Sequence, residues 1–200
     1  MPVRNIPLQQ NTYYHVFNRG CNKQQLFFSH DDYQRFYDTI ARYKISFPTI
    51  RIESFCFLPN HFHFLLIDDA HIANKSGLIQ VRELPSPDLK LSRELENNEE
   101  PKESKKISSF MGKIQQSYAM FFNQKYGESI KKGLKSPVFE GRFKAKIIQD
   151  QDYLEMIRYY VENNAVKHGL VEKPEDWGYS SFDPSREQVE LADEFNPYFL

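Results

Sequence analysis

The chain has 200 residues, 26 of them Lys or Arg and 27 Asp or Glu, so with a net charge of -1 any basic surface must be local. A mean hydropathy of -0.65, without an apolar run near twenty residues, excludes a membrane-spanning segment. Two cysteines without Cys-x-x-Cys spacing exclude a disulfide framework and a thiolate zinc site, and with an N-terminus unlike a signal peptide they indicate the cytoplasm.

The first half of the chain predicts a strand, a helix and a hairpin. Residues 12–18 (TYYHVFN) are dense in β-branched and aromatic side chains, which is typical of a strand. Residues 31–47 place apolar side chains at spacings of three and four behind an acidic first turn, which predicts an amphipathic helix. Residues 50–57 and 61–67 predict two strands joined by a turn at 58–60, and therefore a hairpin.

The second half predicts two more helices around one extended segment. Residues 69–106 are rich in Pro, Ser, Asn, Lys and Glu and have too few apolar residues to fold alone, so we expect a charged connector or insertion. Residues 107–126 repeat apolar side chains with helical spacing and predict a long helix. Residues 138–148 predict extended chain, and 152–164 predict a further helix.

This order of elements indicates the fold class. Strand, helix, strand, strand, helix, strand, helix is the order of a ferredoxin-like α+β sandwich, an antiparallel sheet with helices on one face. At this length we expect one domain over residues 1–200, with 171–200 as a C-terminal extension. Aromatic residues form 15% of the chain, so some rings are candidates for stacking on bases, although a Phe-rich core is the alternative.

The most informative motif is PNHFHFLL, at the start of the strand 61–67. Because side chains alternate along a strand, His61 and His63 project to one face, while Phe62 and Phe64 point into the core. Two neutral imidazoles can bind one divalent cation and leave positions open for substrate oxygens. Histidines with a purely structural role are the alternative, but the flanking apolar alternation favours the metal site.

A local excess of positive charge follows the connector. Between residues 105 and 146 ten Lys or Arg stand against Glu128 and Glu140, and aromatic residues are interleaved with them. This combination predicts a groove for single-stranded or hairpin nucleic acid, with a solvated Lys-rich face as the alternative. The candidate nucleic-acid-binding residues are Arg19, Lys113, Lys125, Arg142, Lys144 and Lys146.

Tyr118 lies on the predicted helix 107–126. A phenol has a pKa near 10, so as a nucleophile it needs a base, or a metal that activates the electrophile. Its spacing from Ile114 and Phe122 also fits a half-buried packing residue, so both roles stay open.

Six separated segments form a series along most of the chain. They are YHVFNRG (14–20), LPNHFHFLL (58–66), YAMFFN (118–123), VFEGRFK (138–144), RYYVENNAVKHGL (158–170) and WGYSS (177–181). In this order they resemble the IS200-like transposase family, the single-tyrosine His-hydrophobic-His nucleases, and in particular its REP-associated tyrosine transposase branch. The resemblance implies a ferredoxin-like catalytic domain that cuts single-stranded DNA near imperfect hairpins with a divalent metal, Mg²⁺ or Mn²⁺.

The resemblance also implies roles for individual residues. His61 and His63 would bind the metal, and Tyr118 would be the nucleophile that forms a 5′-phosphotyrosine intermediate and releases a 3′-hydroxyl. Relatives often supply a third polar ligand one helical turn beyond the tyrosine, where this chain has Phe122. Asn123 is the candidate substitute, with Gln124 as a second choice, although neither has the spacing that shares a face with Tyr118.

The leading hypothesis is therefore a metal-dependent transposase or endonuclease that cleaves and rejoins single-stranded or hairpin DNA. A catalytically silent, domesticated relative that binds structured DNA or RNA as a regulator is the alternative. A small metal enzyme without DNA affinity is a third class, which would show no salt-dependent binding. The long connector leaves open whether the tyrosine acts in cis or on a partner copy, and so whether the protein is a monomer or a homodimer.

Overall fold

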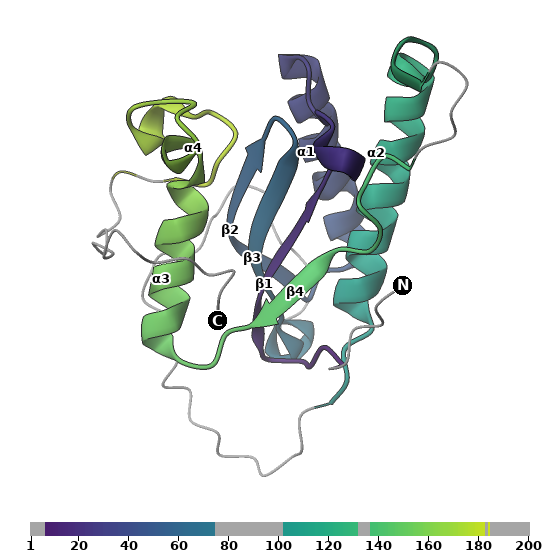
Figure 1. Ribbon diagram of the computed structural model, residues 1–200. Helices are drawn as coiled ribbons and strands as arrows, with labels where there is room; N and C mark the ends of the chain where they lie inside the picture. The colour runs from purple at the N-terminus through teal and green to yellow at the C-terminus, as the bar shows by residue number, and fades with distance from the viewer. Residues whose placement is uncertain (1–6, 75–101, 132–136, 183, 185–200) are drawn as a thin grey trace.

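The computed structural model describes residues 7–74, 102–131, 137–182 and 184, and its centre is a four-stranded antiparallel sheet (Figure 1). In space the strands follow the order β2-β3-β1-β4, so the first strand is central and the last lies at an edge. This arrangement confirms the predicted ferredoxin-like α+β fold. The strands are β1 Tyr13–Arg19, β2 Ile50–Leu58, β3 His61–Asp68 and β4 Lys144–Ile147.

Helices α1 (His30–Ser46) and α2 (Lys106–Lys131) cover one face of the sheet. Helix α1 begins with a capping box, in which Ser29 and Asp32 satisfy each other's backbone amides. Against these helices the sheet presents Phe62, Phe64 and other apolar side chains, which are fully buried in the larger of two core clusters.

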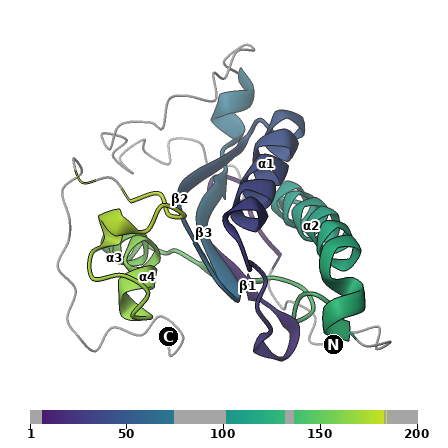
Figure 2. The same ribbon diagram turned by 90° about the horizontal axis from the view of Figure 1, so that it is seen from above.

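Helix α3 (Gln151–Glu162) and the short α4 (Asn164–Lys167) lie on the opposite face, as the view from above shows (Figure 2). Asp150 caps α3, because its side chain accepts a hydrogen bond from the Tyr153 amide. A smaller core cluster, including Leu65 and Ile157, joins these helices to β2 and β3. Helices therefore cover both faces, whereas the sequence predicted helices on one face only.

Strand pairing determines which side chains share the face of α3 and α4. Arg19 is opposite His61 and Phe17 is opposite His63, and directly opposed residues in a sheet point to the same side. His15, two residues earlier on β1, points to this side as well. We call this side the histidine face.

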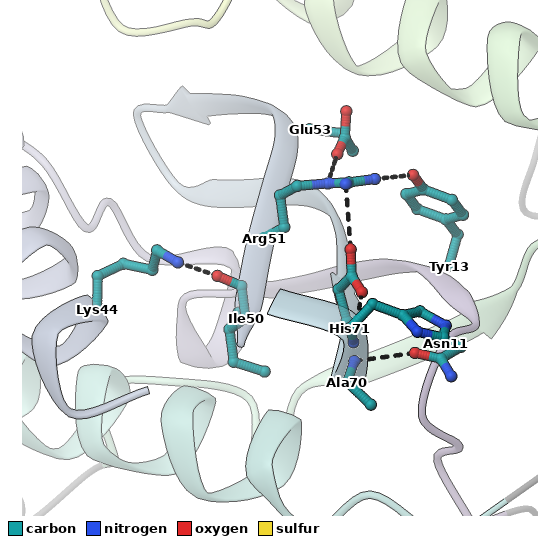
Figure 3. A network of polar contacts seen from close by, with 9 residues as sticks. Asn11, Tyr13, Lys44, Ile50, Arg51, Glu53, Ala70 and His71 are labelled. Atoms are coloured by element: carbon teal, nitrogen blue, oxygen red, sulfur yellow. Dashed lines mark hydrogen bonds and ion pairs between the residues drawn. The ribbon is translucent and has the colours of Figure 1, made fainter. Parts of the chain in front are cut away.

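A polar cluster surrounds Arg51, which is paired with Ile67 near the other end of β3 (Figure 3). Its guanidinium donates to Glu53, to the Tyr13 hydroxyl and, over 3.2 Å, to Asp69. With its charge compensated within the fold, Arg51 serves the structure rather than a ligand.

The predicted connector 69–106 lies mostly outside the described residues, because the structure omits 75–101. The last residues of this segment, just before α2, contact the sheet through Ser104, whose hydroxyl donates to Asp68 over 2.6 Å. Of the predicted extension 171–200, residues 183 and 185–200 are also outside. The described part packs along β2, where the Ser181 amide donates to the Phe55 carbonyl over 2.9 Å.

Candidate active site

The two histidines of PNHFH lie together on the histidine face, at the start of β3. Their ring centroids are 5.1 Å apart and the rings are nearly perpendicular, at 84°. His63 is completely buried, and His61 is partly exposed. The predicted juxtaposition of the two imidazoles is therefore present.

A third histidine, His15 of β1, joins this pair. Its Nε2 lies 2.9 Å from Nδ1 of His63, and its side chain is almost fully buried. His61 has a comparable partner, because its Nδ1 lies 2.6 Å from Oδ1 of Asn60. Sequence reasoning singled out neither His15 nor Asn60 as a site residue.

Burial keeps these imidazoles neutral. It lowers the pKa of His15 to about 3, with a further contribution from the nearby positive charge of Lys146. Burial, together with His168 and Arg19, lowers the pKa of His61 to about 4. The pKa of His63 is also well below its usual value, mainly through burial. Neutral imidazole is the form that binds a metal ion.

Tyr118 does not lie beside the histidines of its own chain, so its role as the nucleophile, in cis or on a partner copy, stays a prediction. It lies on α2, across the sheet, where its ring is fully buried and packs on Phe27 and Phe36. Its hydroxyl donates to the Leu26 carbonyl over 2.8 Å, and burial raises the pKa of the phenol. Asn123 is on the same helix, so it does not complete a metal site with His61 and His63 either.

Another tyrosine stands at the histidines. Tyr160 of α3 is only 5% exposed, and its ring centroid lies 5.7 Å from that of His63 and 5.8 Å from that of His15. Both contacts are edge-on, at 87° and 77°. The sequence predicts a helix over 152–164 and indicates no site role for Tyr160.

Helices α3 and α4 and the residue that follows them place Tyr160, Asn164 and His168 beside His61 and His63, at sequence spacings of four. Tyr160 contacts His63, and at the other end the ring centroid of His168 lies 5.0 Å from that of His61. Between them is Asn164, which is completely buried and whose side-chain oxygen and nitrogen have no hydrogen-bond partner among the described residues. With a spacing of four, Asn164 lies between Tyr160 and His168 in this series.

The site offers neutral donors of a kind that divalent ions take. Among the described residues no cluster of three His, Cys, Asp or Glu is arranged to hold a metal. Two imidazoles and the orphaned amide oxygen of Asn164 nevertheless provide three neutral donors, and substrate phosphate oxygens would supply the rest. An unpartnered buried amide costs free energy, which a ligand would recover.

The predicted nucleic-acid-binding residues divide between the two faces. Lys144 is paired with Phe17 and Lys146 with His15, so both belong to the histidine face. Arg19 shares that face and forms an exposed ion pair with Glu140, and Arg142 is exposed just before β4. Helix α2 instead carries the last two candidates, Lys113, which lies over the Tyr43 ring, and Lys125, which pairs with Asp32.

A hollow of about 380 Å³ adjoins His61 and His168. Its wall combines apolar, amide and charged groups. The lining residues are Lys23, Gln25, Leu58, Pro59, Asn60, His61, His168 and Leu170.

Comparison with known proteins supports the resemblance found in the sequence. Residues 99–164 match the family described as IS200-like transposase, a stretch that contains both tyrosines and Asn164. The resemblance to the IS200-like transposases is confirmed. No protein of curated function matches the chain.

Solved structures extend the comparison to the fold. A REP-associated tyrosine transposase bound to a REP hairpin is 21% identical, with 91% of this chain and 82% of that chain covered and a TM-score of 0.56. It therefore shares its fold with this chain. A putative transposase from Deinococcus radiodurans (10% identity, 82% and 96% covered, TM-score 0.41) and the tRNA(His) guanylyltransferase of Saccharomyces cerevisiae (8%, 84% and 64%, 0.47) are more distant.

Proposed function

We propose that this protein is a transposase or endonuclease that cleaves and rejoins single-stranded DNA at hairpins, with Tyr160 as its nucleophile. The observation that carries the proposal is the position of the Tyr160 ring, 5.7 Å from His63 and on the face that also holds His61. The confirmed family resemblance and the hairpin held by the REP-associated relative support DNA as the substrate.

The reaction would be a transesterification. The phenolic oxygen of Tyr160 gives up its proton to water and attacks the scissile phosphorus, the bond from phosphorus to the 3′-oxygen breaks, and that oxygen takes up a proton to become a 3′-hydroxyl. The DNA 5′ end remains as a phosphotyrosine, which a 3′-hydroxyl from another strand can attack to release the tyrosine. The bond energy is conserved, so rejoining needs no nucleotide hydrolysis.

His61, His63 and Asn164 would hold the divalent metal. When bound, the metal would polarise the scissile phosphate and stabilise the charge that develops on its oxygens. Lys144 and Lys146 would bind neighbouring phosphates, because both are on the histidine face. The hollow beside His61 would receive the nucleotide next to the cleaved bond.

The proposal is tested with labelled hairpin oligonucleotides incubated with Mn²⁺ or Mg²⁺ and separated on denaturing gels. We expect a protein-linked DNA band for the wild type and for Tyr118→Phe, and its loss in Tyr160→Phe, which lacks only the reacting oxygen. A band that persists in Tyr160→Phe and disappears in Tyr118→Phe would refute the assignment. Hairpin binding without any band would favour the regulatory alternative. The absence of both hairpin binding and a band would refute the assignment of DNA as the substrate.

A further inference from the structure

Asn60 has an amide orientation that is defined by two hydrogen bonds. Its Nδ2 donates to the Lys23 carbonyl over 3.3 Å, so the other amide atom, Oδ1, faces Nδ1 of His61 at 2.6 Å. An amide oxygen can only accept a hydrogen bond. Nδ1 of His61 must therefore carry the proton, which leaves Nε2 of this neutral ring with the lone pair that a metal requires.

His15 performs the corresponding role for His63. The contact between Nε2 of His15 and Nδ1 of His63, 2.9 Å long, occupies Nδ1 of His63, so a metal would have to bind this ring through Nε2. In that state Nδ1 of His63 carries the proton and Nε2 of His15 accepts it. A neutral His15 can do so, because one nitrogen of a neutral imidazole is always an acceptor.

We infer that Asn60 and His15 are positioning residues that hold His61 and His63 with the proton on Nδ1, so that both rings present Nε2 to one divalent cation. The inference rests on the proposed metal-dependent function and deepens it. Partners of this kind fix the tautomer and the orientation of a ligating ring, and their loss typically weakens metal affinity by about 10- to 100-fold. Burial of His15 at 1% exposure and of His63 at 0% protects the contact from competition by water.

Two matched pairs of variants test the inference. Asn60→Asp and His15→Gln keep an acceptor at the required position, whereas Asn60→Ala and His15→Leu remove it. In the metal-free protein, ¹⁵N NMR of the imidazoles should identify His61 as the Nδ1–H tautomer in the wild type and in Asn60→Asp, and not in Asn60→Ala. Mn²⁺ affinity, followed by electron paramagnetic resonance, should fall about 10-fold or more in each removing variant and stay within about threefold of the wild type in each retaining one.

Several results would overturn the inference. They are an Nε2–H tautomer at His61 in the wild type, equal Mn²⁺ affinity within each pair, or no Mn²⁺ binding by the wild type at all. Circular dichroism melting identifies variants that fail to fold. The tautomer and the Mn²⁺ affinity are then compared between the removing and retaining variants on folded protein only, so a local effect on the histidines is distinguished from unfolding. The covalent-adduct assay tests the proposed function separately from the positioning roles. Mn²⁺ binding with the expected tautomer but no adduct would refute the proposed DNA cleavage and leave the positioning roles intact.

Discussion

Tyr118→Phe separates a structural tyrosine from a catalytic one. The substitution removes one oxygen from a fully buried ring and keeps the packing on Phe27 and Phe36. It also withdraws the donor that lies 2.8 Å from the Leu26 carbonyl in the core. Deleting one partner of a buried hydrogen bond costs about 1–3 kcal/mol, since the remaining group is buried without this donor.

This loss is measurable by thermal melting. For a chain of this size each kcal/mol lowers Tm by about 2–4 °C, so we expect a decrease of roughly 2–12 °C in Tyr118→Phe. The protein-linked DNA band should persist at a temperature where the variant is folded, and Tyr160→Phe under the same conditions should give no band. A Tyr118→Phe variant with wild-type Tm and no adduct would refute the structural role and restore Tyr118 as the nucleophile.

Three further predictions follow from the same geometry. The double substitution of Lys144 and Lys146 by Gln should reduce the slope of log affinity against log salt concentration by roughly 1.4 for single-stranded DNA. Lys113→Gln, on the opposite face, should leave this slope unchanged. A double variant with the wild-type slope would show that DNA does not bind on the histidine face. EDTA should abolish adduct formation and leave hairpin binding largely intact, with Mn²⁺ restoring the band, and a band that survives EDTA would contradict the metal role. Asp32→Asn should lower the free energy of unfolding by about 2–3 kcal/mol in urea titrations, because it weakens charged hydrogen bonds. It should also make the urea concentration at the unfolding midpoint depend less on pH in the acid range.

The acid dependence has a definite sign. Burial opposes ionisation of Asp32, but hydrogen bonds from Lys125, Tyr126 and the amides of Phe28 and Ser29 outweigh it and lower the pKa of this carboxyl. A group with a lowered folded-state pKa stabilises the protein above its unfolded pKa, near pH 4, and its contribution is lost as the pH falls through the folded-state value. The wild type should therefore lose more stability than Asp32→Asn below about pH 4.

Local patterns predicted most of the fold, because each depended on a single element. Alternation in PNHFHFLL placed His61 and His63 on one face, and the helix predicted at 107–126 corresponds to α2 at Lys106–Lys131. The ferredoxin-like order could also be predicted, because it depends on the succession of elements along the chain and on short connections between them. The structure confirms it.

The choice of tyrosine needed information that periodicity does not contain. Tyr118 and Tyr160 both occupy the apolar stripe of an amphipathic helix, and both are buried. Helical spacing indicates that such a residue faces the sheet, but not which face of the sheet its helix covers. Likewise, the contact of His15 with His63 depends on the register between β1 and β3, which alternation within either strand does not determine.

The sheet thus separates two kinds of tyrosine environment, and this separation is the reason for proposing Tyr160 rather than Tyr118 as the nucleophile. On the α1 and α2 face, Tyr118 is enclosed by aromatic rings, and its hydroxyl is committed to a backbone carbonyl. On the histidine face, Tyr160 lies against neutral imidazoles and under the ammonium group of Lys167, 4.9 Å from its ring. Both phenols are buried, so what distinguishes Tyr160 is its contact with the imidazoles and with the Lys167 ammonium group. The same sheet that buries one tyrosine as a packing residue therefore places the other beside the histidines that would hold the metal, which is the arrangement that the proposed cleavage requires.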